Sequence, residues 1–143
     1  MLSHVWSVLC QEAITDAESN NISLINVYER LTIPQSIVDQ IPSDKDGAKF
    51  AFPHRLVSMW IRDTKDSAKA NYRIRLLSPD GKPIVVSVEA TIEIKPPKQR
   101  MRTLLVGNEL FFSRPGIYNF QVQLKTAKNW RTVAKVPLDM VVN

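Results

Sequence analysis

The sequence has few of the residues on which catalytic and metal chemistry depend. It contains one cysteine, Cys10, two histidines and four glycines among 143 residues. A single thiol cannot form a disulfide within the chain, which indicates a reducing compartment. The scarcity of glycine argues against a glycine-rich phosphate-binding loop. No Gly-x-Ser-x-Gly motif accompanies the histidines, so serine hydrolase chemistry is disfavoured as well.

Long apolar runs are also missing. The N-terminal residues include no Lys or Arg, and His4 and Ser7 interrupt their apolar run, unlike the pattern of a secretory signal. No segment approaches the roughly 20 apolar residues that span a bilayer. The sequence therefore predicts a soluble, cytoplasmic protein with no membrane partner.

What the sequence does contain is the material for a core. Its residues are 44% hydrophobic, enough for one domain over 1–143 without disulfides or metal. The clearest pattern lies in residues 114–126, where apolar and polar side chains alternate. The inward set is Tyr118, Phe120, Val122 and Leu124, and the set expected in water is Asn119, Gln121, Gln123 and Lys125. A period of two predicts a strand with one face in a core.

Similar alternation and turn residues elsewhere predict further strands. These are expected at 5–15, 22–33, 50–62, 71–77, 83–95, 101–112 and 130–142. We expect a bulge near Asn26, a bend at Gly107 and Asn108, and an edge or bulge at Pro137. Residues 36–41 lie between Pro34 and Pro42 and predict one short helical turn. With about eight strands and no long helical period, the predicted fold is an all-β antiparallel sandwich, with an open barrel as the alternative.

Two parts of the chain resemble a known family. The first is the expected N-terminal hairpin, Leu9-Cys10-Gln11-Glu12 followed by Ile-Ser-Leu-Ile-Asn-Val-Tyr over 22–28. The second is Ser-Pro-Asp-Gly at 78–81, followed downstream by Pro115-Gly116-Ile117-Tyr118. The chain is similar in these motifs to a bacterial family of small single-domain proteins of unknown function. The resemblance implies an immunoglobulin-like sandwich and brings no activity, cofactor or partner.

Gly116 and Tyr118 are predicted to have structural roles. In many sandwich domains a tyrosine near the start of a late strand hydrogen-bonds back across a corner of the chain. Tyr118 follows the Pro115-Gly116 turn and begins the clearest strand, so its position suits such a corner.

Catalytic and metal sites find little support in the residues present. His54 is expected to be a surface or half-buried histidine, and a hydrolase is the third choice of function. His4, Cys10 and Glu12 share one face of an extended strand, too far apart to reach one zinc ion. Asp44 and Asp46 lie in a loop that lacks the later ligands of a calcium site. We therefore predict no catalytic residues, metal or cofactor.

Basic residues offer a second choice of function. The net charge is +5, and cations cluster in three places, which favours a polyanion-binding module for RNA or DNA. The residues predicted to make this contact are Arg73, Arg75, Lys98, Arg100, Arg102 and Trp130. Basic side chains on outward strand faces also keep sheets soluble and blunt their edges, so this charge has an ordinary explanation too.

Protein binding is the first choice. A sandwich presents edge strands, and an exposed tryptophan or the Phe111-Phe112 pair could anchor a protein partner or a homodimer. The candidate anchors include Trp6, Trp60 and Trp130. The sequence thus predicts a non-enzymatic protein-binding or assembly module that makes contact through an edge strand or the turns at one end.

Overall fold

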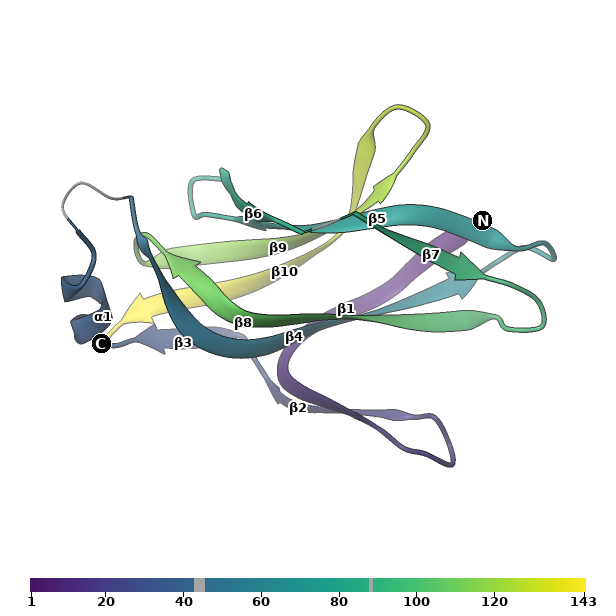
Figure 1. Ribbon diagram of the computed structural model, residues 1–143, viewed down its shortest axis with the longest axis horizontal. Helices are drawn as coiled ribbons and strands as arrows, with labels where there is room; N and C mark the ends of the chain where they lie inside the picture. Colours follow the sequence, from purple (N-terminus) through teal and green to yellow (C-terminus); the bar gives the residue numbers. More distant parts are fainter. Residues whose placement is uncertain (43–45, 88) are drawn as a thin grey trace.

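The computed structural model describes residues 1–42, 46–87 and 89–143, and its strands form two sheets (Figure 1). Sheet A has the order β2-β1-β4-β8, built from β1 (Leu2–Thr15), β2 (Ile22–Val27), β4 (Ala48–Arg62) and β8 (Arg100–Phe112). Sheet B has the order β3-β10-β9-β5-β6, and β7 also pairs with β5. Its strands are β3 (Arg30–Ile33), β5 (Ala68–Leu77), β6 (Pro83–Val86), β7 (Ala90–Ile94), β9 (Gly116–Lys125) and β10 (Trp130–Val142).

The all-β sandwich that the sequence predicts is confirmed. The short helix α1 (Gln35–Asp39) lies where a helical turn was expected, beginning one residue and ending two residues earlier than predicted, and Ile37 and Val38 pack against the core. The predicted pairing of the first two strands is also found, because β1 and β2 form an antiparallel hairpin. No helix in the described ranges is long and apolar enough to cross a bilayer.

Ten strands are described where the sequence predicts about eight, because two of the predicted strands are each divided. Residues 22–33 form β2 in sheet A and β3 in sheet B, and the chain leaves β2 just after Asn26, whose φ is +53°. β3 then runs parallel to β10, so the sheets are not wholly antiparallel. The irregularity expected near Asn26 is thus a change of sheet.

Residues 83–95 are divided in the same way, into β6 and β7. Between them Ser87 replaces a strand partner of Ile74, donating its N–H to the Ile74 carbonyl and accepting the Ile74 N–H at its hydroxyl, each at 2.7 Å. The alternation of this segment predicts that Ile84, Val86 and Val88 share one inward face. Ile84 packs against the core, whereas Val86 is exposed, and Val88 lies outside the described residues.

The other two predicted irregularities lie close to their expected positions. At the expected bend, Asn108 of β8 faces two residues of β4, Phe52 and Pro53, so the extra residue belongs to β4. In β10 the register shifts at Val133, and Pro137 lies where β10 has β9 as its strand neighbour but not yet β3. Proline is tolerated there because its missing N–H removes no ladder bond on an unpaired side.

The core lies between the sheets and includes β9. All members of its predicted inward set are buried, as the alternation requires. The opposite face differs from the prediction, because Gln121 and Gln123 are only 7% and 4% exposed. Side chains from β5 and β10 cover these two glutamines, so this part of the outer face of sheet B is not in water.

Candidate functional site

One face of sheet A packs into the core and the other faces away from it. Leu9 and Leu56 are paired across β1 and β4, and both belong to the core. Because successive residues of a strand point to opposite faces, Val57 points outward. Residues paired across neighbouring strands form rows on this outer face of sheet A, and the row of Val57 contains Val8 and Leu104. The other rows are Trp6, Met59 and Arg102; Ser3, Ile61 and Arg100; and Val27, Cys10, Arg55 and Val106.

The outer face of sheet A is mainly apolar and only partly covered. Val27, Leu104 and Val106 are each about half exposed, and Ile61 is exposed as well. Arginines stand in three of the four rows, so cations border the apolar surface. Contiguous exposed apolar surface of this kind, rimmed by polar groups, marks interaction sites more often than a scatter of single residues does.

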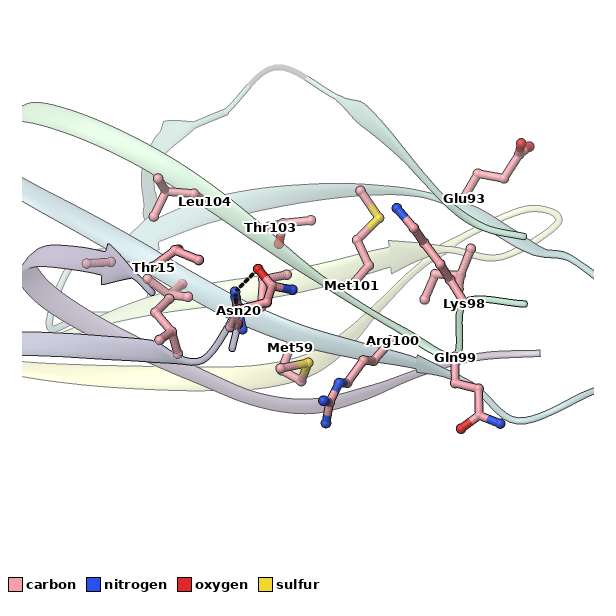
Figure 2. Close-up of a pocket in the computed structure, with 15 residues that line it drawn as sticks. Thr15, Asn20, Met59, Glu93, Lys98, Gln99, Arg100, Met101, Thr103 and Leu104 are labelled. Carbon is pink, nitrogen blue, oxygen red and sulfur yellow. Dashed lines mark hydrogen bonds between the residues drawn. The ribbon is translucent and has the colours of Figure 1, made fainter. Parts of the chain in front are cut away.

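The tip of the β1–β2 hairpin reaches this face and encloses a groove (Figure 2). The Arg102 guanidinium donates from Nη2 to the backbone oxygen of Asn20 in the hairpin tip, at 2.8 Å. The groove has a volume of about 700 Å³. Val57, Met59 and Leu104 supply apolar lining, while Lys98, Arg100 and Arg102 supply positive charge. Glu93 adds one carboxylate to the lining, but it is already paired with Lys69 and Lys95. The groove is therefore suited to an apolar group that carries a negative charge.

Beside the groove, β8 forms the edge of sheet A. Its thirteen residues have β4 as their one strand neighbour in the sheet order. The turn before β8 is held by Arg62, whose Nε and Nη2 donate to the Lys98 carbonyl at 3.1 and 2.9 Å. A long edge strand presents unpaired backbone groups to which an extended segment of another chain can add.

The polyanion contact predicted from the sequence is divided between two surfaces. Arg100 and Arg102 lie on the outer face of sheet A, and Lys98 lies in the turn that precedes β8. Arg73 and Arg75 of β5 lie in sheet B, where the Arg73 guanidinium carbon is 4.2 Å from the centroid of the Trp130 ring. The structure thus brings Arg73, Arg75 and Trp130 together and separates them from the other three cations.

The hydrophobic anchors predicted from the sequence are divided between the core and the surface. Trp60 and Phe112 belong to the core and are not available to a partner. Trp6, Phe111 and Trp130 are partly exposed. The surface groups that matter more are Leu104 and Val106, which sequence reasoning missed. The sequence does show that Leu104 and Val106 lie on the same face of a long strand, because they are two residues apart. It does not show whether that face points into the core or away from it.

His54 is buried, which corrects the expectation of a surface or half-buried histidine. It is 4% exposed, and its ring lies 5.7 Å from that of Phe52 and 5.9 Å from that of Phe120. Nδ1 is 2.7 Å from the Phe52 carbonyl oxygen; a carbonyl only accepts, so Nδ1 carries the proton. Opposite it, a Cβ on Gly107 would lie 2.3 Å from the imidazole, so glycine leaves room for the ring.

Burial sets the titration of His54. Loss of solvent lowers the pKa of its imidazole, the nearby Arg55 charge lowers it further, and the bond to Phe52 opposes this shift. Burial likewise lowers the pKa of His4. Protonation therefore favours the unfolded chain, and we expect the free energy of unfolding to fall as the pH drops below about 6.5, the ordinary histidine value.

This expectation is checked by urea unfolding between neutral pH and about pH 5, above the range in which ordinary carboxylates titrate. Replacing His54 by phenylalanine keeps an aromatic ring in the same space and removes one of the two titrating groups. The variant should lose part of the pH dependence in this window. A pH dependence unchanged by the substitution would show that the buried imidazole does not titrate as described.

Metal chemistry finds no assembled ligand set in the described residues. No three His, Cys, Asp or Glu side chains there lie close enough to hold an ion. Of the three residues considered for zinc on the first strand, His4 has its Nε2 at 2.7 Å from the Ser7 hydroxyl. Burial raises the pKa of the Cys10 thiol, which disfavours the thiolate that a metal would need. In the acidic loop considered for calcium, Asp44 lies outside the described residues.

Tyr118 and Gly116 form a corner at the start of β9. The Tyr118 hydroxyl donates to the Arg114 carbonyl at 2.8 Å and accepts from the N–H groups of Ser113 and Arg114 at 2.9 and 3.1 Å. Gly116 has φ +146°, and a Cβ there would lie 2.9 Å from the Pro79 ring. The hydroxyl thus ties the strand to the turn before it, as in the tyrosine corner of sandwich domains.

The fold and surface geometry define a β-sandwich with one apolar outer face and one polar, basic outer face. A model of a family of unknown function, DUF6941, matches residues 5–136, and the chain belongs to this family. No curated protein matches the chain.

Proposed function

We propose that this chain is a non-enzymatic protein-binding or assembly module whose contact surface is the outer face of sheet A with the open edge of β8. The observation that carries the proposal is the clustering of exposed apolar side chains, Leu104 and Val106 of β8 among them, on a face whose edge strand β8 has β4 as its one neighbour among the described strands. Edge backbone groups supply affinity for an added strand, and the alternating side chains supply specificity.

The chemistry of the surface defines the partner. Arg55, Arg100 and Arg102 stand in rows with apolar residues, and Lys98 lies at the groove. Complementarity of charge steers association and rejects wrong partners. The partner is therefore a protein segment in extended conformation, with apolar residues alternating with or flanked by acidic ones. The acidic residues near this face include Glu12, opposite Ile25 on the hairpin, and Glu93, which lines the groove and pairs with Lys69 and Lys95.

We also propose an immunoglobulin-like fold and a bacterial, cytoplasmic setting. The immunoglobulin-like description is supported by the corner at Tyr118, where the hydroxyl bonds back to the Arg114 carbonyl. A bacterial, cytoplasmic protein agrees with the one thiol of the chain, Cys10, which is buried and unpaired. A second copy of the chain is the homodimeric alternative to a different partner protein.

The test uses a random peptide library displayed on phage and selected on the purified protein. Peptides with apolar and acidic residues are expected to be enriched, and Val106→Arg should weaken the binding of a selected peptide at least about tenfold, as for an interface anchor. Ile117→Arg is the matched control: Ile117 is 53% exposed and Val106 52%, and Ile117 lies at the start of β9 in sheet B.

Three outcomes would count against the proposal. They are no enriched peptide, equal loss in the two variants, or enrichment of basic peptides only. Light scattering of the purified protein decides between the two kinds of partner. A dimer that Val106→Arg dissociates and Ile117→Arg leaves intact would make the partner a second copy of the chain.

A further inference from the structure

A second surface lies on the outer face of sheet B, away from the proposed protein-binding face. Arg73 and Arg75 are two residues apart on β5, so they point to the same side. The register places Gln123 of β9 opposite Arg73, and Gln121 opposite Arg75. In β10, Thr132 pairs with Gln123, and Lys135 pairs with Gln121. Two rows of polar residues thus cross three strands.

The glutamines hold both guanidinium groups in place. Gln123 Oε1 accepts from Arg73 Nε at 2.8 Å, and Gln123 Nε2 donates to the Thr132 hydroxyl at 3.1 Å. Gln121 Oε1 accepts from both Nε and Nη2 of Arg75, at 3.2 and 2.8 Å. Both glutamine side chains are buried, so their surroundings restrict their conformations. Their hydrogen bonds in turn restrict the orientation of the two guanidinium groups. A site arranged before binding loses less conformational entropy when a ligand arrives.

The charge of these arginines is not neutralised within the part of the chain that the structure describes. None of the ion pairs found there includes Arg73 or Arg75, whereas Arg30 pairs with Asp139 at 3.5 Å. Glu89, which bonds to Asn71 of β5 and Lys125 of β9, has its oxygens occupied by these residues, at 2.9 Å from Asn71 and 3.5 Å from Lys125. The partners of Arg73 and Arg75 are neutral amides, which orient a cation without cancelling its charge.

An aromatic ring completes the surface. The Arg73 guanidinium lies over the Trp130 ring, and Lys125 Nζ is 5.7 Å from the same ring. Bases of single-stranded nucleic acids stack on aromatic rings and on guanidinium planes, while arginine and lysine bind their phosphates. An acidic protein segment would use the charge but not the planar groups. We infer that Arg73, Arg75 and Trp130 bind single-stranded nucleic acid, with the arginines on the phosphodiester backbone.

The experiment is a fluorescence anisotropy titration of a labelled single-stranded oligonucleotide over a series of salt concentrations. Substitution of both arginines, R73Q with R75Q, should weaken binding by about tenfold or more at low salt. It should also reduce the slope of log K against log salt by about 1.4, since each phosphate contact on a single strand contributes about 0.7. The matched control is R100Q with R102Q, which removes the same charge from sheet A and should leave the slope unchanged.

Two more comparisons separate a built site from general attraction. Gln123→Leu keeps every charge but releases Arg73, and should weaken binding in a variant whose unfolding curve confirms that it is folded. Equal losses in the two arginine double variants, or no binding by the wild-type chain at low salt, would overturn the inference. So would competition by polyglutamate as effective as that by an unlabelled oligonucleotide of equal charge, which would make the ligand an acidic protein.

Discussion

Replacing Tyr118 by alanine is expected to lower the free energy of unfolding by about 3–5 kcal/mol, the usual cost of truncating a buried aromatic residue. Tyr118 is fully buried, packs with its ring 6.5 Å from that of Phe112, and bonds through its hydroxyl to the turn before β9. The substitution therefore leaves a cavity in the core and removes the hydrogen bonds that tie β9 to the turn before it. Equilibrium urea denaturation followed by tryptophan fluorescence measures the change.

Tyr118→Phe separates the two contributions. Phenylalanine keeps the ring in the core but removes the hydroxyl, leaving the Arg114 carbonyl and the N–H groups of Ser113 and Arg114 without this partner. Groups left unsatisfied in this way cost about 1–3 kcal/mol. If phenylalanine were as costly as alanine, the corner would dominate; if alanine cost less than about 1 kcal/mol, Tyr118 would not be part of the core.

The strand that carries Tyr118 also explains what the sequence can and cannot reveal. Its inward set could be predicted because four apolar residues keep one phase without interruption. The burial of Gln121 and Gln123 could not, since it depends on arginines more than forty residues away in sequence. Alternation reports which residues face a core, but a polar face is buried or exposed according to which strands lie beside it.

The division of two predicted strands could not be predicted for a related reason. Residues 22–33 read as one strand because apolar residues continue through it, yet φ +53° at Asn26 is followed by a change of sheet. Asparagine adopts this conformation more easily than most residues, so the irregularity was detectable but its consequence was not. Which sheet accepts β3 is decided by pairing with β10, more than one hundred residues later.

The candidate surfaces show the same limit. The basic residues are evident from composition, but only the pairing of β5 with β9 separates Arg73 and Arg75 from Arg100 and Arg102. Likewise, the sequence predicts a strand over 101–112 but not which of its apolar residues face outward, and the order of sheet A makes β8 an edge with its outer side uncovered. The result is a sandwich whose two outer faces have different chemistry, so variants on one face are suitable controls for the other.

The largest buried side chain gives the second strong prediction for stability. Trp60 is fully buried, and its Nε1 donates to the Thr103 hydroxyl of β8 at 2.9 Å. Its ring lies 5.2 Å from that of His4 and 6.0 Å from that of Tyr72, so it connects β1, β8 and sheet B. Trp60→Ala should lower the free energy of unfolding by about 3–5 kcal/mol, measured by thermal or urea unfolding followed by circular dichroism.

A double-mutant cycle assigns part of that loss to the hydrogen bond between β4 and β8. Thr103→Val keeps the volume but leaves the indole N–H of Trp60 unsatisfied, at a cost of about 1–3 kcal/mol. Trp60→Phe removes the donor itself, so the valine substitution should then cost much less. Such non-additivity is expected for residues in direct contact. If the two substitutions added instead, the indole would contribute through packing alone, and the edge strand β8 would be held by its backbone ladder and not by this bond.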